Sequence, residues 1–215
     1  MIMQRAFVKK SYYSAAVLNP GSVDFADVKT EAVRKSLHFL IALSPALTTL
    51  NFSFAVFILS FGVLGYIIME LLRHSGVKVP LVSTLTRMAS RTRERDGFVL
   101  GPVTLGLGAL FALIFFPFPV ASIAIYALAF GDGFASLTGK LYGRLRPAFL
   151  SGKSIEGSTA CFAATFISAY LVSHSIVISL AAAFAATAIE ALPLEDYDNI
   201  ALPLAVGFVV QIFYK

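Results

Sequence analysis

The stretch Phe52–Met69, FSFAVFILSFGVLGYIIM, decides the class of fold. It contains no charged residue and approaches the roughly 20 apolar residues that a helix needs to cross a bilayer. The rest of the chain is similar, because 58% of its 215 residues are hydrophobic, 13% are charged, and the mean hydropathy is +0.81. An average soluble domain carries roughly 25% charged residues. We therefore exclude a soluble enzyme and a disordered chain, and expect an integral membrane protein.

Seven apolar segments predict an all-α, polytopic membrane protein with about seven transmembrane helices. The first segment is short, which indicates that its helix begins earlier, near Phe25. The segments are Leu37–Leu50, Phe52–Met69, Phe98–Phe116, Val120–Leu137, Ser158–Val172, Ile176–Ile189 and Ile200–Phe213.

The basic residues follow a pattern along the chain. All Lys and Arg except Lys215 lie before the first segment or in the connections after the second and fourth. The alternate connections Thr48–Asn51, Pro117–Pro119 and Ser173–Ser175 are short and uncharged. Since basic loops stay on the cytoplasmic side, the pattern predicts a cytoplasmic N-terminus and chemistry at the cytoplasmic face. The alternative is that the long loops only anchor the topology. The formal charge of +5 is attributed to topology, so no nucleic-acid partner is expected.

Asp132 is the first candidate for chemistry, because it lies inside the fourth apolar segment. A carboxylate there is energetically unfavourable and marks a functional site by default. Gly139 and Gly143 follow at a spacing that also suits simple helix packing. An Asp beside glycine-rich backbone and Lys140 suits Mg²⁺ and phosphate, although the spacing is not that of a Walker A loop.

A second candidate is a polar stripe ahead of the first segment. Glu31, Arg34, Lys35 and His38 share one helix face, because residues three, four and seven positions apart line up. Arg34 and Lys35 suit phosphate binding. The structural alternative is an ion-paired start of a helix with snorkelling basic side chains.

Two clusters later in the chain add further polar groups. Lys153 and Glu156 flank a stretch that ends at Gly157, which suits either a phosphate contact or an ordinary helix N-terminus with an acid near its dipole. Four acids then lie in one connection, either as a solvated loop or as metal ligands: Glu190, Glu195, Asp196 and Asp198.

Two other charged groups are not assigned to the site itself. Glu70 and Arg73, three residues apart, are interpreted as a structural ion pair at the end of a helix. The arginines Arg87, Arg91, Arg93 and Arg95 attract anions, either lipid headgroups or substrate phosphate.

In chain order these motifs resemble the CTP-dependent lipid-alcohol kinases, the family of dolichol kinase, phytol kinase and the CTP-dependent diacylglycerol kinases. The matching pieces are Glu31-x-x-Arg34-Lys35-x-x-His38, Asp132-x-x-Ala135-x-x-x-Gly139-x-x-x-Gly143, Lys153-Ser-Ile-Glu156-Gly157-Ser158, and Glu190 with Asp198-Asn199-x-x-x-Pro203. The family more often has Thr where Ser154 stands, and the chain is shorter than eukaryotic dolichol kinases.

The resemblance implies transfer of the γ-phosphate of CTP, with Mg²⁺, to the hydroxyl of a polyprenol, dolichol or phytol in the bilayer. The expected catalytic residues are Asp132, Arg34, Lys35 and His38. The expected nucleotide-binding residues are Gly139, Lys140, Gly143, Lys153, Glu156 and Gly157. The expected metal ligands are Asp132, Glu156, Glu190 and Asp198.

The resemblance also sets the expected organisation and the competing functions. Residues 1–30 are expected to form a cytoplasmic segment and residues 31–215 one transmembrane catalytic domain. The protein is expected to be integral to a membrane, the plasma membrane if it is prokaryotic, and a homo-oligomer is compatible with it. The first alternative is an enzyme like phosphatidate cytidylyltransferase, which makes a CDP-lipid. The second is a small membrane transporter.

Overall fold

The computed structural model describes residues 25–77, 79, 97–150 and 152–214, and every regular element among them is helical. The predicted all-α class is therefore confirmed. The main helices are α2 Phe25–Ile41, α3 Ser44–Leu50, α4 Phe52–His74, α6 Gly101–Phe115, α7 Phe118–Tyr126, α8 Gly133–Leu141, α9 Ile155–Ser173, α10 Ile176–Glu190 and α11 Asp198–Phe213. A π-helical turn, η2 Ala127–Asp132, joins α7 to α8, and the 3-10 turns η3 Ala148–Leu150 and η4 Glu195–Tyr197 lie in connections.

Each predicted apolar segment is helical. α4, α9 and the continuous helix Phe118–Leu141 are long and apolar enough to cross a membrane, whereas α6 and α10 are apolar but shorter. These helices support a membrane protein. Seven crossings and a cytoplasmic N-terminus stay predictions. The N-terminal residues 1–24 and the arginines of segment 80–96 lie outside the described residues.

The first predicted helix differs from the structure, because it is interrupted between α2 and α3. Pro45 lies in the first turn of α3, and proline has no backbone N–H to continue the α-helical ladder. The Ser44 hydroxyl instead donates to the Ile41 carbonyl oxygen over 2.8 Å. The chain thus bends without leaving that carbonyl unpaired.

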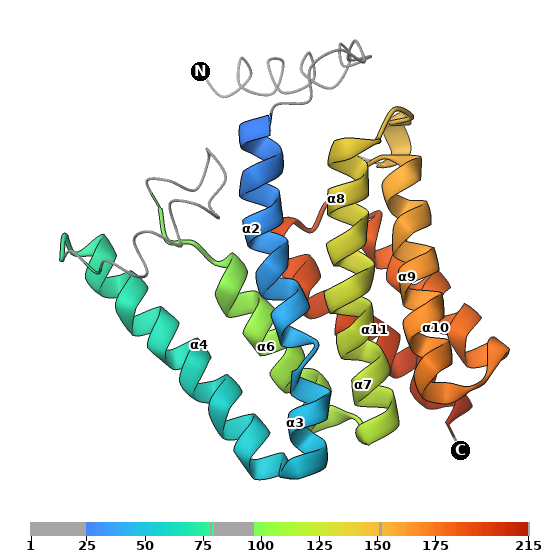
Figure 1. Cartoon of the computed structure of the whole chain (residues 1–215), viewed down its shortest axis with the longest axis horizontal. Helices are drawn as coiled ribbons and strands as arrows, with labels where there is room; N and C mark the ends of the chain where they lie inside the picture. The colour runs from blue at the N-terminus through green and yellow to red at the C-terminus, as the bar shows by residue number, and fades with distance from the viewer. Residues whose placement is uncertain (1–24, 78, 80–96, 151, 215) are drawn as a thin grey trace, which may run out of the picture.

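The helix that runs from Phe118 to Leu141 lies at the centre of the bundle (Figure 1). Its residues Val120, Ile123, Ile125 and Leu128 are fully buried. A helix that is apolar all round is expected to be buried, so this segment forms the core against which α9 and α11 pack. It also carries Asp132 into the interior.

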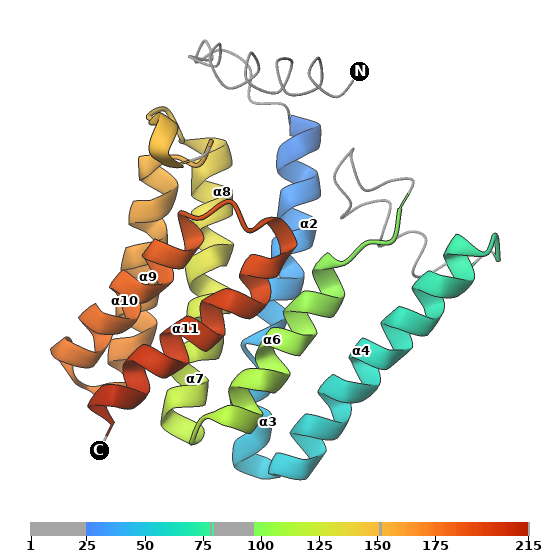
Figure 2. The same ribbon diagram turned by 180° about the vertical axis from the view of Figure 1, so that it is seen from behind.

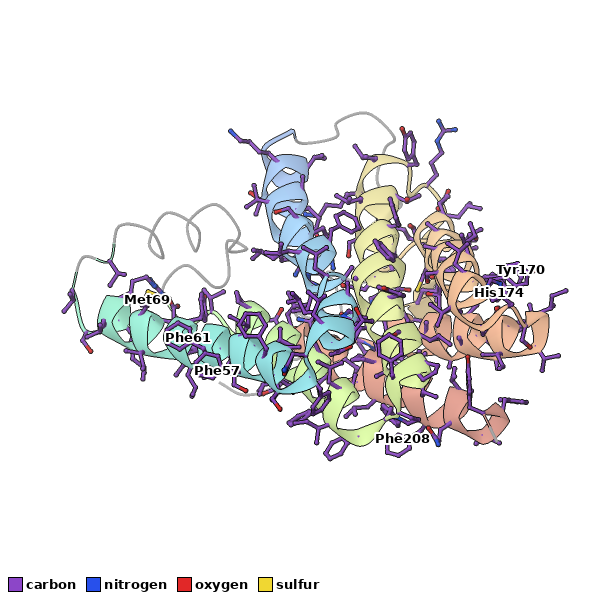
Figure 3. All side chains as sticks on the ribbon, turned by 60° about the horizontal axis from the view of Figure 1, so that its bottom comes forward. Phe57, Phe61, Met69, Tyr170, His174 and Phe208 are labelled. Atoms are coloured by element: carbon purple, nitrogen blue, oxygen red, sulfur yellow. The ribbon has the colours of Figure 1, made fainter. Side chains whose placement is uncertain are left out.

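Helix α4 lies at the edge of the bundle and diverges from it towards its C-terminal end, as Figures 1 and 2 both show. Its outward face is apolar, with Phe57 and Phe61 exposed. Figure 3 labels these rings together with Phe208 of α11, which is exposed in the same way. Exposed large apolar side chains on many helices are what a lipid-facing surface requires.

Glu70 and Arg73 attach α4 to the segment that leads into α6. Arg73 makes two hydrogen bonds of 2.7 and 2.8 Å to the Glu70 carboxylate, and a third to the Gly97 carbonyl oxygen. The Val99 amide donates to Glu70 over 3.0 Å, and Glu70 is fully buried. The interpretation of this pair as structural is confirmed.

Candidate functional site

The polar stripe of α2 faces α8 and the π-helical turn. Glu31, Lys35 and His38 are all buried, at 1–3% exposure, and Arg34 is half-buried. All four predicted residues of the stripe therefore turn into the protein. A buried lysine needs a partner because an unpaired charge away from water is strongly unfavourable.

That partner is Asp132, the last residue of the π-helical turn η2. Lys35 Nζ forms a short ion pair with Asp132 Oδ2, and His38 Nε2 lies 2.9 Å from the same oxygen. π-Helical turns inside α-helices are rare and are frequent at functional sites. The structure thus joins three of the four residues expected to be catalytic, two from α2 and one 97 positions along the chain from Lys35.

Asn199 of α11 contacts the ring of His38. Its amide nitrogen donates to Thr104 Oγ1 over 3.0 Å and to the Gly101 carbonyl oxygen over 3.4 Å. Its amide oxygen therefore faces His38 Nε2, at 3.0 Å. This oxygen and the Asp132 carboxylate are both acceptors at Nε2. Lys35 Nζ lies 3.4 Å from Nε2, and the Arg34 carbonyl oxygen lies 3.4 Å from Nδ1. The two closest partners of Nε2 therefore favour a proton on that nitrogen.

Asn199 and Thr104 belong to the candidate site by their hydrogen bonds, although the sequence reasoning did not place them there. Asn199 stood in the last quoted motif, but no role followed from it. Its polar side chain at the start of an apolar segment was the available signal. Gly108 supports this position, because a Cβ there would lie 2.0 Å from the Asn199 carbonyl oxygen. Only a glycine lets α6 and α11 approach so closely.

Glu31 gathers two further cations at the outer end of the stripe. Arg34 Nη2 lies 2.6 Å from one of its carboxylate oxygens, and Lys140 Nζ of α8 lies 3.2 Å from the other. Burial raises the pKa of the Glu31 carboxyl, but the charges of Arg34, Lys35 and Lys140 outweigh it, and the pKa falls to about 2. Glu31 therefore holds both cations in place as a permanent anion.

Lys153 and Glu190 form a second polar cluster between α9 and α10. Lys153 Nζ donates through a short hydrogen bond to the Glu190 carbonyl oxygen and lies 3.3 Å from its carboxylate. The Ser158 hydroxyl donates to the same carboxylate over 3.2 Å. Two predicted residues, one nucleotide-binding and one metal-binding, are thus paired with each other.

The connection from α8 to α9 is held by Glu156 and Arg146. Glu156 accepts hydrogen bonds from the backbone N–H groups of Arg144 and Leu145 at 3.0 and 3.2 Å. The Arg146 guanidinium donates to the Gly139 and Gly152 carbonyl oxygens at 2.7 and 2.6 Å. These hydrogen bonds give the loop a defined shape, and they place the Arg146 side chain beside α8.

The glycines at the junction of α8 and α9 pack closely against neighbouring parts of the chain. A Cβ at Gly143 would lie 2.6 Å from Ser154 Oγ, and one at Gly157 would lie 2.8 Å from the Ala135 carbonyl oxygen. Gly139 is similarly close to Ser154, at 3.1 Å. Ser154 itself caps α9 by accepting from the Gly157 amide over 3.1 Å. These glycines bring α8 against the start of α9, and nucleotide contact by them stays a prediction.

Asp198 is the first residue of α11 and lies ahead of the apolar part of that helix. Burial, and after it the negative charge of Asp132, raise the pKa of Asp198 to about 7, although Lys35 and Lys153 oppose the shift. Among the described residues, no group of three or more His, Cys, Asp or Glu is placed to hold a metal ion. Mg²⁺ is often bound by one or two carboxylates together with substrate phosphates. Asp132 and Asp198 are two carboxylates whose negative charges repel each other. A pair of this kind fits that mode of binding.

Comparison with known proteins identifies the class of protein first. The chain is similar to proteins named phytol kinase and to one named CTP-dependent diacylglycerol kinase, which confirms the resemblance expected from its motifs. A probable chloroplastic phytol kinase of Triticum aestivum is 29% identical over 148 residues, which are 60% of this chain and 49% of that protein. Phytol kinase 1 of Arabidopsis thaliana is 27% identical over 149 residues, 61% of this chain and 49% of the plant protein.

A fungal relative adds the nucleotide. The CTP-dependent diacylglycerol kinase 1 of Eremothecium gossypii is 42% identical over 62 residues, which are 29% of this chain and 20% of that protein. The chain spans about half the length of the phytol kinases it matches. No family model matches the chain, and no solved structure matches it significantly.

Proposed function

We propose that the chain transfers the γ-phosphate of CTP to the hydroxyl of a lipid alcohol of the phytol or polyprenol type. The observation that carries the proposal is the buried ionic cluster formed by Lys35, Asp132 and His38, with Arg34 and Lys140 beside it. Phosphoryl transfer requires positioning and charge neutralisation more than covalent chemistry from the protein. A set of cations held by acids at one end of apolar helices suits this requirement.

Each cation near the cluster is paired with an acid, and a phosphate group can replace that acid as its partner. Arg34 and Lys140 share Glu31, and Lys153 is paired with Glu190. Phosphate oxygens accept charge-assisted hydrogen bonds from Lys and Arg as carboxylates do. We infer that the triphosphate binds over these side chains and that the acids keep them oriented before it arrives.

Asp132 and Asp198 are the residues that would hold Mg²⁺. The ion supplies positive charge to the phosphate oxygens when bound. The contacts of Asp132 with Lys35 and His38 are both made to Oδ2. Glu190 and Glu156 fit the role less well, because Glu190 accepts from Ser158 through one oxygen and pairs with Lys153 through the other, while both oxygens of Glu156 accept from backbone amides. His38, whose Nε2 lies 2.9 Å from Asp132 Oδ2, is placed to orient that carboxylate.

The same proposal includes the topology. Figures 1 and 2 show the start of α2, the C-terminal end of α4, the start of α6 and the connections α8–α9 and α10–α11 towards one end of the bundle. We infer seven crossings with this end and the N-terminus in the cytoplasm, because all basic residues except Lys215 lie before the first apolar segment or at the connections α4–α6 and α8–α9. Residues 31–215 then form one catalytic domain behind residues 1–30, integral to the plasma membrane if the protein is prokaryotic. A homo-oligomer remains compatible with this arrangement.

The test is the fate of two labels in CTP. The full chain, in membranes or purified, is given CTP labelled at the γ- or the α-phosphate and a panel of phytol, farnesol, polyprenol and diacylglycerol. We expect the γ-label in the lipid product, no transfer of the α-label, and weaker donation by ATP. Asp132→Asn is expected to abolish transfer, whereas Glu195→Gln, in the exposed part of the acidic loop, leaves it unchanged.

Each competing function gives a distinct result in this experiment. Transfer of the α-label with release of pyrophosphate would show a cytidylyltransferase. Solute flux through reconstituted vesicles without turnover of any nucleotide would show a transporter. Full activity of Asp132→Asn would refute the role assigned to Asp132 while leaving the reaction in place.

A further inference from the structure

An apolar groove lies between α2–α3, α4 and α6, with a volume of about 470 Å³. This is within the usual range for a site that holds a small molecule. Most of its lining is aliphatic, including Leu37, Ile41, Leu47, Ile58, Leu59 and Leu105. Six side chains with polar groups also line it, namely Arg34, His38, Ser44, Tyr66, Asp196 and Asn199. The groove is thus mostly apolar along the helices, and its charged groups lie where α2 meets the start of α11.

We propose that this groove binds the part of the lipid alcohol's tail next to the hydroxyl, and that Gly62 of α4 determines which tails fit. The inference rests on the proposed function, because it assigns the acceptor of that reaction. The supporting observation is continuity. His38 lines the groove and also lies 2.9 Å from Asp132, while Asn199 lines it and contacts His38. A tail in the groove therefore brings its own polar end to the ionic cluster.

Arg34 lines the polar end of the groove, and its side chain has an unpaired donor. Arg34 Nε is buried and has no hydrogen-bond partner among the described residues. A buried donor without a partner is unfavourable unless a ligand or water meets it. The oxygen-bearing end of an amphiphilic substrate at Arg34 supplies an acceptor, which an all-carbon occupant does not. This favours an alcohol over a purely apolar ligand.

Gly62 and Gly106 have opposite roles on facing helices. A Cβ at Gly106 would lie 2.3 Å from Val63 Cγ2, so this glycine lets α4 and α6 pack together. A Cβ at Gly62 would meet nothing within 4 Å, although Gly62 lines the groove. Helix packing therefore does not require a glycine at position 62. The missing side chain instead leaves space in the groove for an occupant.

The length of the groove limits how much of the lipid tail it can contact. Its lining on α4 runs from Ile58 to Tyr66, which is about 12 Å of helix at 1.5 Å per residue. Because α4 lies at the edge of the bundle (Figures 1 and 2), the remainder of a long tail passes out into the surrounding lipid. The site therefore accepts long tails of different length but discriminates their bulk near the hydroxyl.

The test compares Gly62→Leu with Gly65→Leu in the full chain in phosphatidylcholine nanodiscs. Both changes replace a glycine on α4, and leucine is the better helix former, but Gly65 does not line the groove. The probe is a long-chain alcohol with a photoreactive diazirine in its proximal tail. We expect Gly62→Leu to reduce labelling of α3, α4 and α6 about tenfold or more, the size of effect that bulk in an apolar pocket produces.

Kinetics provide the second readout. Gly62→Leu is expected to raise the KM for phytol by a similar factor without changing the KM for CTP, and Gly65→Leu to match the wild type. Labelling that maps to α9 or α10, or that Gly62→Leu does not reduce, would overturn the groove while phosphoryl transfer persisted. Competition by added phosphatidylcholine as strong as by unlabelled alcohol would overturn it too, as a site for ordinary bilayer lipid.

Failure of the proposed function gives another pattern. If no nucleotide label reaches any alcohol, while alcohol labelling still lies in the groove and still depends on Gly62, the kinase is refuted and the groove stands. A thermal unfolding measurement on each variant confirms that the comparison is made between folded proteins.

Discussion

Replacing Lys35 by Met tests whether the ionic cluster has the buried character that the proposed reaction depends on. The Lys35 side chain is 2% exposed and that of Asp132 is 6% exposed. Removing one partner of a buried pair leaves an uncompensated charge and destabilises by about 3–5 kcal/mol. His38 Nε2, at 2.9 Å from Asp132, still donates to the carboxylate. We therefore expect the lower end of that range.

The expected loss converts into a measurable shift. For a chain of this length, a loss of about 3 kcal/mol lowers the melting temperature by about 6–12 °C. In the double variant Lys35→Met with Asp132→Asn, neither charge remains, and most of that loss should be recovered. Phosphoryl transfer is not expected to return, because the double variant lacks the groups assigned to phosphate and metal.

The chain contains its own probe for the measurement. It has no Trp and a single cysteine, Cys161, which is fully buried. A maleimide that fluoresces on reaction with a thiol reports unfolding when Cys161 becomes accessible. Lys29→Met, on the exposed side of α2, is the matched control and should shift the transition little. Equal transitions for Lys35→Met and Lys29→Met, or a double variant no more stable than Lys35→Met, would refute a buried ion pair.

Three further outcomes are expected. Asn199→Leu removes the acceptor that orients His38, so turnover with phytol should fall about tenfold or more, and a wild-type rate would exclude this positioning role. Since the pKa of Asp198 is raised to about 7, the folded state binds the extra proton, and stability should fall as pH rises from about 4 to 7. Asp198→Asn should remove that slope in thiol-probe melts at several pH values, and an unchanged slope would assign it to another group. Glu70→Gln should lower the melting temperature, because the Val99 amide and Arg73 lose their anion, yet leave the KM for CTP unchanged; a raised KM would place this pair in the nucleotide site.

The sequence predicted the helices well because apolar runs and their breaks are local signals. The break between α6 and α7 at Pro117, for example, follows directly from proline chemistry. The interruption after Ile41 was missed, because a single Pro45 inside an apolar run is equally compatible with a kinked membrane helix. Helix spacing also placed Glu31, Arg34, Lys35 and His38 on one inward face.

The pairings within the site were not predictable in the same way. Nothing local connects Lys35 with Asp132, Lys140 with Glu31, or Lys153 with Glu190, because these contacts depend on how α2, α8, α9 and α10 pack. No sequence signal separates Glu190 from Asp198, whereas the structure pairs Glu190 with Lys153 and brings Asp198 near enough to Asp132 for that charge to raise its pKa. The groove along Gly62 had no sequence signal, since a glycine that provides space looks the same as one that permits packing.

The π-helical turn at Ala127–Asp132 also sets the angular phase between the two halves of the central helix. Such a turn holds one residue more than the α-helical turn it replaces, and each residue advances an α-helix by about 100°. α7 can therefore keep its apolar faces in the core. Beyond the turn the helix is rotated, so that Asp132 at the end of the turn and Lys140 of α8 both face α2. The extra residue separates two requirements on one continuous helix, namely core packing by α7 and the orientation of Asp132. Substitutions that improve packing in α7 therefore need not change the direction in which Asp132 points. A deletion of one residue between Ala127 and Gly131 would couple them again, and would turn the carboxylate away from Lys35 or strain the core.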